Sequence, residues 1–302
     1  MDDTELKYSR IIERVCTVPW AMRPETLTVV MDILSQRAAG VRFTADEARA
    51  RVDAARSDSP RGASRGVVAV VPLVGMIIHR PDFFAETSEG ATSVQRFVSS
   101  FRAAVADSNV RSVVIDIESP GGIISGVPEA AAEVFAARQG SKKIVAVANA
   151  EAASAAYWIG SAADELVVSP SAEVGSIGVW TAHVDASKFF EEKMGLKHTL
   201  ISAGKYKVEG HPFGPLDDDA RAYIQERIDG DYDDFVKAVA KHRGRPPGDV
   251  REKFGQGRMV GARRAVELGM ADRVGTLQET ITRMQGPAGA PRKTRTAHDF
   301  SF

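Results

Sequence analysis

The chain of 302 residues has almost no net charge and only one cysteine. Lysine and arginine together number 39 and aspartate and glutamate 40, so the overall charge indicates neither nucleic acid nor an anionic membrane as a partner. The single cysteine, Cys16, excludes an intrachain disulfide and fits a reducing compartment. No metal-like spacing surrounds Cys16, so we interpret it as a small buried apolar residue and expect neither a metal nor another cofactor.

The chain also lacks a long apolar run. The longest, residues 67–78, has 12 residues and is interrupted by Pro72 and Gly75. A helix needs about 20 apolar residues to span a bilayer. Residues 1–6 are acidic and polar, whereas a secretory signal begins basic and continues apolar. We therefore expect a cytoplasmic protein that requires no membrane.

The residues that are present divide the chain into four parts. Apolar residues recur at helical spacing within residues 24–39. Residues 56–66 are rich in serine, glycine, proline and arginine. That segment is typical of a flexible connection and is a candidate site for self-cleavage. The last residues carry basic side chains among prolines and glycines, as in a disordered, solvated terminus. The predicted parts are an N-terminal helical segment (1–56, with helices at 24–39 and 45–55), a linker (57–66), a main domain (67–285) and a tail (286–302).

Strand-like and helix-like patterns alternate along the main domain. Alternation of this kind is typical of an α/β layer fold with a largely parallel sheet, because each crossover helix returns the chain to the same edge. The predicted strands are 66–76, 110–118, 143–148 and 165–168, and the predicted helices are 93–106, 128–138, 154–163, 216–242 and 262–268.

One serine lies in a setting typical of a nucleophile. The strand-like run 143–148 is followed by the alanine-rich segment 149–163, which contains Ser154. At the start of a helix, free N–H groups and the positive end of the macrodipole favour a nearby anion. The same position suits a serine that only caps the helix or fills space, so both interpretations stay open here.

Two adjacent glycines, Gly121 and Gly122, follow the strand predicted at 110–118. A glycine turn exposes backbone N–H groups that can donate to an oxyanion, and each donor is worth ~3 to 4 kcal/mol of barrier in a water-excluded site. An ordinary tight turn is the alternative. The spacing is not that of a dinucleotide loop or a phosphate loop.

A serine nucleophile needs a base, and lysine is a better candidate than histidine. Lys207 follows a strand-like segment and could be buried at the sheet edge, and the alternative is an ordinary solvated lysine. Burial lowers the pKa of a lysine, and the neutral amine can then take the proton of Ser154. The histidines are scattered and are interpreted as surface or loop residues: His79, His183, His198, His211, His242 and His298.

Four motifs in this order resemble the signal peptide peptidase family, peptidase S49. They are Ser119-Pro-Gly-Gly122, the Ser154 segment through Asp164, Val174-Gly-Ser-Ile-Gly-Val179 and Gly204-Lys-Tyr-Lys207. The resemblance covers residues 67–274 and implies a layered parallel sheet with helices on both faces, similar to the Clp protease and crotonase folds. It also implies a ring-like homo-oligomer.

The same resemblance implies roles for individual residues. Ser154 would be the nucleophile, Lys207 the general base, and the N–H groups of Gly121 and Gly122 the oxyanion hole. If the alignment with the family is shifted by two residues, Lys205 is the general base instead of Lys207. This chain has Ser154-Ala-Ala156 where family members often have Ser-Gly-Gly, which affects helix packing more than chemistry. The implied wall of the substrate groove is formed by Val174, Gly175, Ser176, Ile177 and Gly178.

Within the family, the chain is most similar to the head-maturation proteases of tailed phages and prophages. This likeness rests on residues 207–212 and on the acidic segment 216–221. It implies a metal-independent Ser/Lys endopeptidase that cleaves scaffold or portal-associated proteins inside a prohead. Alternatives are a cytoplasmic peptidase that clears signal-peptide remnants, an inactive capsid-assembly component, and a hydratase-like enzyme in which Glu118 and Glu151 act as acids.

Overall fold

The computed structural model describes residues 19–22, 64–65, 67–80 and 91–286. The helices predicted at 24–39 and 45–55, most of the linker and nearly all of the tail lie outside these residues. Those predictions therefore stay predictions.

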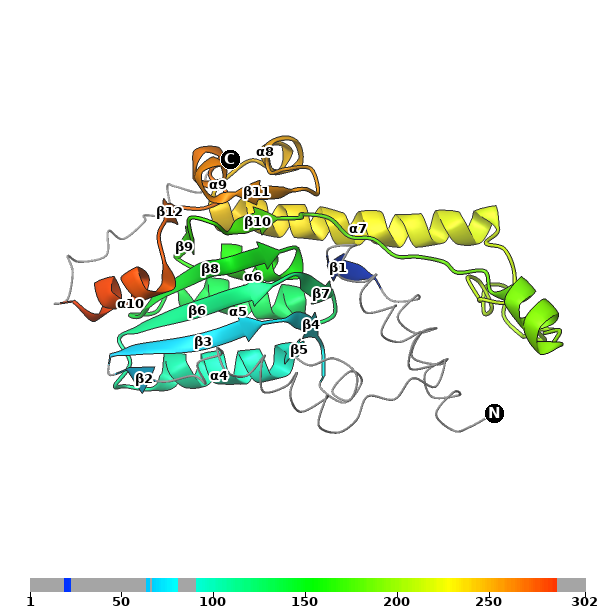
Figure 1. Cartoon of the computed structure of the whole chain (residues 1–302), viewed down its shortest axis with the longest axis horizontal. Coiled ribbons are helices and arrows are strands. Elements are labelled where there is room, and N and C mark those ends of the chain that lie inside the picture. The colour runs from blue at the N-terminus through cyan, green and yellow to red at the C-terminus, as the bar shows by residue number, and fades with distance from the viewer. Residues whose placement is uncertain (1–18, 23–63, 66, 81–90, 287–302) are drawn as a thin grey trace.

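An eight-stranded sheet lies at the centre of the described chain (Figure 1). Its strand order is β11-β10-β8-β6-β3-β2, with β9 pairing to β8 and β12. Neighbouring strands from β3 to β10 are parallel, and only the edge pairs β2/β3 and β10/β11 are antiparallel. This confirms the predicted largely parallel α/β fold. The strands are β2 (Ser64–Arg65), β3 (Val68–Val74), β6 (Ser112–Ser119), β8 (Lys143–Ala153), β9 (Glu165–Val168), β10 (Glu173–Gly175), β11 (Met259–Gly261) and β12 (Arg273–Val274).

A second sheet of four strands adjoins the first at the carboxyl ends of β3 and β6. Its order is β1-β7-β4-β5, so β7 has a neighbour on each side. Strand β4 follows β3 after the single residue Gly75, and β7 follows β6 after Pro120, which places the small sheet at this edge. Its strands are β1 (Trp20–Met22), β4 (Met76–Ile78), β5 (Ala91–Ser93) and β7 (Gly121–Ile123).

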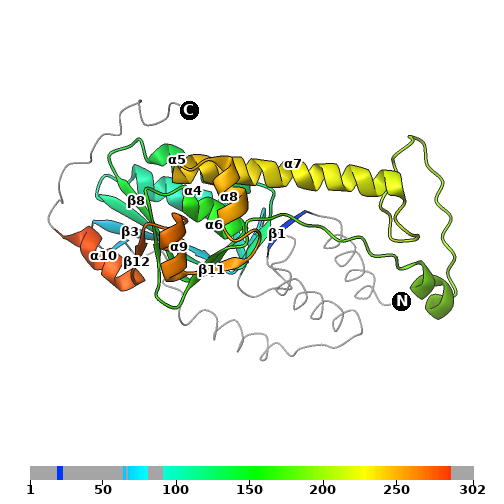
Figure 2. The same cartoon turned by 90° about the horizontal axis from the view of Figure 1, so that it is seen from above.

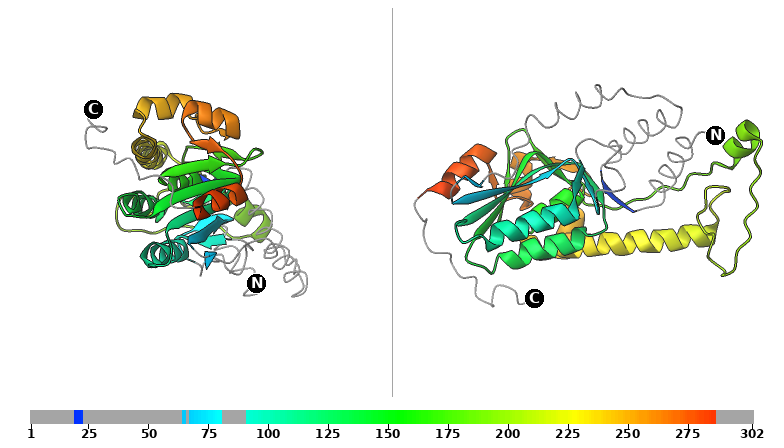
Figure 3. Two further views of the ribbon diagram at one scale, coloured as in Figure 1. Left: turned by 90° about the vertical axis from the view of Figure 1, so that its left-hand side faces the viewer. Right: turned by 90° about the horizontal axis from the view of Figure 1, so that it is seen from below.

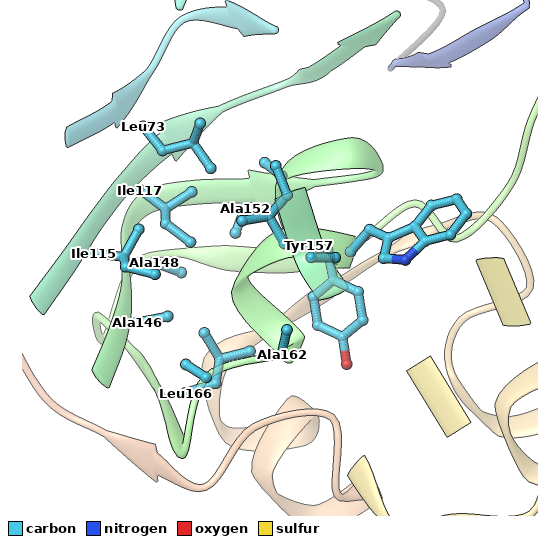
Figure 4. Packing of buried hydrophobic residues seen from close by; sticks show 14 of the residues in the cluster. Leu73, Ile115, Ile117, Ala146, Ala148, Ala152, Tyr157, Ala162 and Leu166 are labelled. Carbon is cyan, nitrogen blue, oxygen red and sulfur yellow. The ribbon is translucent and has the colours of Figure 1, made fainter. Parts of the chain in front are cut away.

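Helices cover both faces of the large sheet, as the resemblance implies (Figure 3). Alternate residues of β6 point to opposite faces, so Ile115 packs towards α6, whereas Val114 packs with Ile281 of α10. The main core lies on the α6 side, where β6 and β8 meet Tyr157 and Ala162 (Figure 4). The helices are α4 (Val94–Ala106), α5 (Val127–Ala137), α6 (Ala155–Ser161), α7 (Asp218–Arg243), α8 (Pro247–Lys253), α9 (Ala262–Leu268) and α10 (Leu277–Gln285).

Helix α7 extends well beyond the sheet (Figures 1 and 2). Its 26 residues span about 39 Å at 1.5 Å per residue. Its second half packs on the main core through Phe235 and Val239. We call residues 181–234 the arm. The arm includes the short π-helix η2 (Phe189–Lys193), and Ala220 is its one fully buried residue, because the arm has no core of its own.

Predicted and observed elements agree closely in the main domain. Helix α4 begins one residue after predicted and is capped by Ser93, whose hydroxyl accepts a hydrogen bond from the Arg96 N–H. Strand β9 and helix α9 have the predicted bounds. Strand β8 runs to Ala153, five residues past its predicted end at Ala148. No helix within the described residues has both the length and the apolar character needed to cross a bilayer.

Candidate active site

Ser154 lies at a strained turn between β8 and α6. Its backbone has φ 54° and ψ −116°, a left-handed conformation that is uncommon for a residue with a side chain. The turn is held on both sides, because the Ser154 N–H donates to the Gly175 carbonyl at 2.7 Å and the Trp158 N–H donates to the Ser154 carbonyl at 2.9 Å. A serine on a strained turn from strand to helix is the arrangement of a nucleophile elbow.

The Ser154 hydroxyl does not cap the helix. Although Ser154 occupies the N-cap position of α6, its side chain makes no capping hydrogen bond. Instead, Oγ donates to the Gly178 carbonyl over a long 3.5 Å. The residue is only 1% exposed. The capping interpretation therefore does not account for this hydroxyl, which has one weak partner among the described residues.

Gly121 lies directly beside Ser154, and Gly122, the next residue of β7, packs against Ile77. A Cβ atom on Gly121 would lie 3.0 Å from Ser154 Cβ, and one on Gly122 would lie 1.9 Å from the Ile77 carbonyl oxygen. Gly121 also has φ 94°, so a side chain is excluded at both positions. The Gly121 N–H already donates to Ser119 Oγ at 3.2 Å, and that hydroxyl donates to the Gly75 carbonyl at 2.7 Å.

The segment predicted as the groove wall contacts Ser154 at two points, the carbonyl of Gly175, which accepts from the Ser154 N–H, and the carbonyl of Gly178. Val174 and Gly175 belong to β10, which pairs with β8 on one edge and β11 on the other and so has no free edge. Ser176 and Ile177 are buried, and Ser176 has φ 52°. The segment then reaches Ser154 through the carbonyl of Gly178.

Lys207 lies apart from Ser154 within this chain. It is an exposed residue of the arm, so the expected burial at the sheet edge is wrong for this chain by itself. Lys207 lies in the same loop as Gly210, which adjoins Ile224 on the first turns of α7. Ser154 is one turn from Trp158, which stacks on Phe235 with ring centroids 4.4 Å apart. The 11 residues from Ile224 to Phe235 correspond to roughly 16 Å along the helix.

Lys205, the alternative base, belongs to the same exposed loop. Its Nζ donates to the Tyr206 hydroxyl at 2.6 Å. The structure therefore brings together Ser154, the two glycines and Gly178, and it leaves both lysines on the arm.

His242 is buried, which corrects its interpretation as a surface residue. Its Nδ1 is 3.0 Å from the hydroxyl of Ser161, which donates to the Trp158 carbonyl at 2.9 Å. Burial is the main reason that the pKa of His242 is lowered to about 3. Because this serine and histidine both lie inside a helix contact and away from solvent, they form a structural pair rather than a second catalytic site.

The acidic residues near the end of β6 do not adjoin the glycine pair. Glu118 and Glu151 line an open pocket of about 400 Å³ together with Glu173, and neither glycine lines it. On the same strand, burial raises the pKa of Asp116 to about 6, with a smaller contribution from Glu118. Among the described residues, no group of three or more His, Cys, Asp or Glu side chains could hold a metal ion.

Comparison with known proteins assigns this chain to a family. The profile of peptidase family S49 matches residues 136–290, which include Ser154 and the arm. The chain belongs to peptidase family S49. This S49 chain is 30% identical over 267 residues to the capsid assembly protease C of Escherichia phage lambda, an alignment that covers 87% of this chain and 60% of the phage protein.

Two further relatives widen the comparison. The head-tail preconnector protein GP5 of Enterobacteria phage P21 is 32% identical over 217 residues, 72% of this chain and 42% of that protein. Protease 4 of Salmonella typhi is 28% identical over 227 residues, 72% of this chain and 34% of that protein. The S49 chain thus spans between about a third and three fifths of the length of these relatives.

Proposed function

We propose that this S49 chain is a serine endopeptidase with Ser154 as its nucleophile. The observation that carries the proposal is the strained β8–α6 turn, where a hydroxyl not used for capping lies beside Gly121 and Gly122. Oγ would attack the scissile carbonyl, and backbone N–H groups of the glycine pair would stabilise the oxyanion, with the Gly121 N–H leaving its hydrogen bond to Ser119 Oγ to do so. The acyl-enzyme would then be hydrolysed by water, with no metal or other cofactor in the reaction.

Lys207 is proposed as the general base, supplied by a second copy of the chain. The loop of this lysine adjoins the N-terminal end of α7, whereas its own serine lies near the second half of that helix. The arm also exposes apolar side chains that a second copy could cover. Ile201 is 95% exposed and Phe189 58% exposed. In a homo-oligomer, the amine of Lys207 would accept the Oγ proton of a neighbouring Ser154 and later donate it to the leaving amine.

We propose head proteins of a phage or prophage as substrates, including scaffold and portal-associated proteins. Support comes from the printed names of the lambda and P21 relatives, a capsid assembly protease and a head-tail preconnector. The expected setting is the cytoplasm or the interior of a prohead. A peptidase for signal-peptide remnants and an inactive assembly component remain the alternative functions, and the genomic neighbours separate the first of these from the phage role.

The test combines single variants with a mixing experiment. We expect Ser154→Ala and Lys207→Ala each to abolish cleavage of an unfolded protein substrate, monitored by mass spectrometry with a chelator present. Mixing the two inactive variants under conditions that exchange subunits should restore cleavage in about a quarter of the sites if the lysine comes from another copy. Lys205→Ala is the matched control and should remain active.

Two results would contradict the proposal. No recovery in the exchanged mixture would contradict a lysine supplied by a second copy. A wild type that cleaves neither an unfolded protein nor its own head proteins would favour the non-enzymatic assembly role.

A further inference from the structure

A short strand from the beginning of the described chain lies beside the proposed active site. Strand β1 pairs antiparallel with β7, with Ala21 opposite Gly122 and Met22 opposite Gly121 (Figure 1). Its other edge pairs with Trp180, through bonds from the Trp20 N–H to the Trp180 carbonyl at 2.8 Å and from the Trp180 N–H back at 3.0 Å. The three residues of β1 are at most 1% exposed.

The main chain of β1 comes close to Ser154. A Cβ atom on Gly121 would lie 2.2 Å from the Ala21 carbonyl oxygen and 3.0 Å from Ser154 Cβ. The Ala21 carbonyl oxygen and Ser154 Cβ therefore both lie next to Gly121. A carbonyl from another segment of the chain thus lies beside Gly121, one of the two glycines that the proposed mechanism assigns to the oxyanion.

The position of β1 is also the one edge through which a peptide could pair with β7. On its opposite edge, β7 already pairs with β4, where Ile77 lies opposite Gly122. An extended peptide adds to a sheet by its main chain and uses side-chain pockets for specificity. Such a peptide cannot pair with β7 while β1 is in place.

We propose that Trp20–Met22 occupies the peptide-binding slot of this peptidase and blocks it as an internal pseudosubstrate. This inference rests on the proposed function. The slot takes an extended peptide with a small residue at the position of Ala21, whose side chain is fully buried in the core, and a large apolar residue on each side. Because β1 belongs to the same chain, its effective concentration is high, and an external peptide must displace it to reach Ser154.

A reversible disulfide tests whether β1 and a peptide compete for one slot. Directly opposed residues in a hydrogen-bonded antiparallel pair have Cα atoms about 5.5 Å apart, which suits a disulfide. The full-length quadruple variant Cys16→Ser, Trp20→Cys, Ser154→Ala, Trp180→Cys can therefore lock β1 in place when oxidised and release it when reduced. The removal of Cys16 prevents mispairing, and Ser154→Ala makes the readout binding alone.

The probe is a fluorescent peptide with the sequence of residues 18–24. We expect binding to the reduced variant and at least tenfold weaker binding to the oxidised variant, with the crosslink quantified by mass spectrometry. The same variant with Trp180 retained cannot form the crosslink and should bind equally in both states. Equal binding to the oxidised and reduced forms of the locked variant, or binding to neither, would overturn the inference.

An activity measurement separates this inference from the proposed chemistry. Ala21→Arg cannot fit its side chain in the core and should release β1, so Ser154-dependent hydrolysis should rise about tenfold; Ala21→Ser is the conservative control. Unchanged or lower hydrolysis by Ala21→Arg, with native circular dichroism and an active wild type, would count against the block. If the peptide binds the reduced variant but not the oxidised one, and no variant hydrolyses peptides, the proposed catalysis is wrong. The proposal that β1 occupies the peptide-binding slot is then still supported.

Discussion

The part of the molecule around Ser154 and the arm that carries Lys207 are built on different principles. Ser154 is held by backbone hydrogen bonds to β10 and α6 and is surrounded by buried residues. The arm buries one residue and exposes aromatic and aliphatic side chains. The proposed nucleophile is therefore prearranged within one chain, whereas the proposed base depends on contacts that this chain does not make by itself.

The largest expected effect contrasts two aromatic residues of α7. Phe235 is fully buried and stacks on Trp158, so Phe235→Ala should lower the free energy of unfolding by about 3–5 kcal/mol. Tyr223, on the arm, is 54% exposed, and Tyr223→Ala should change it by less than about 0.5 kcal/mol. Urea denaturation measures both. Equal losses in the free energy of unfolding would show that the arm is packed as tightly as the region around Ser154.

A methyl group on Gly122 tests how tightly the glycine strand is held. Gly122→Ala should lower the free energy of unfolding by about 1–3 kcal/mol, because the new Cβ meets the Ile77 carbonyl at 1.9 Å and the backbone must move. Cleavage should fall with it, since the oxyanion donors shift. The matched control is Gly261→Ala in β11, where an added Cβ has no atom within 4 Å. A stable, fully active Gly122→Ala variant would contradict the proposed oxyanion site.

A pH-dependent prediction concerns Asp116 in the body. The folded state raises the pKa of this carboxyl to about 6, against about 3.9 in the unfolded chain. The protonated acid therefore favours folding below pH 4, and this contribution is lost as the pH rises through 6. Asp116→Asn should raise the free energy of unfolding by about 3 kcal/mol at pH 7 and hardly at pH 3. Glu192→Gln, on the arm, is the control. If Asp116→Asn raised the free energy of unfolding equally at pH 3 and pH 7, the titration of Asp116 would not be the cause.

The smallest expected effect compares helix glycines in the two regions. Gly230 lies within α7 on the arm with open space around it, so Gly230→Ala should stabilise the helix by about 1 kcal/mol. Amide exchange along the first half of α7 should slow about fivefold. Gly160→Ala in α6 should have the opposite sign, because its Cβ would lie 2.7 Å from Ile117 Cδ1. Faster amide exchange in the Gly230→Ala variant would contradict the open space around position 230.

Local patterns predicted some of the elements around Ser154, whereas β5, β7, β11, β12, α8 and α10 were not predicted. The helix α4 and the strand β9 were predicted because their apolar periodicity and their flanking turn residues agree with the final packing. The extension of β8 beyond Ala148 was not predicted, because residues 149–153 are poor strand formers. They become a strand by pairing with β10 and with Ser119.

The candidate site was only partly predictable. The position of Ser154 between a strand and a helix followed from the sequence, whereas its positive φ depends on the pairing around it. Strand β1 has three residues, and its partners lie about a hundred residues or more away, so no local pattern indicates it. The separation of Lys207 from Ser154 results from the direction of α7, which no motif spacing encodes.

The length of the arm has a consequence for timing. A single chain, whose serine and lysine lie apart, would be catalytically silent at high dilution. If the proposed exchange of lysines between copies holds, activity should rise more steeply than in proportion to protein concentration, because each working centre needs two chains. Crowding many copies into a closed shell would then switch the enzyme on, with no other signal required.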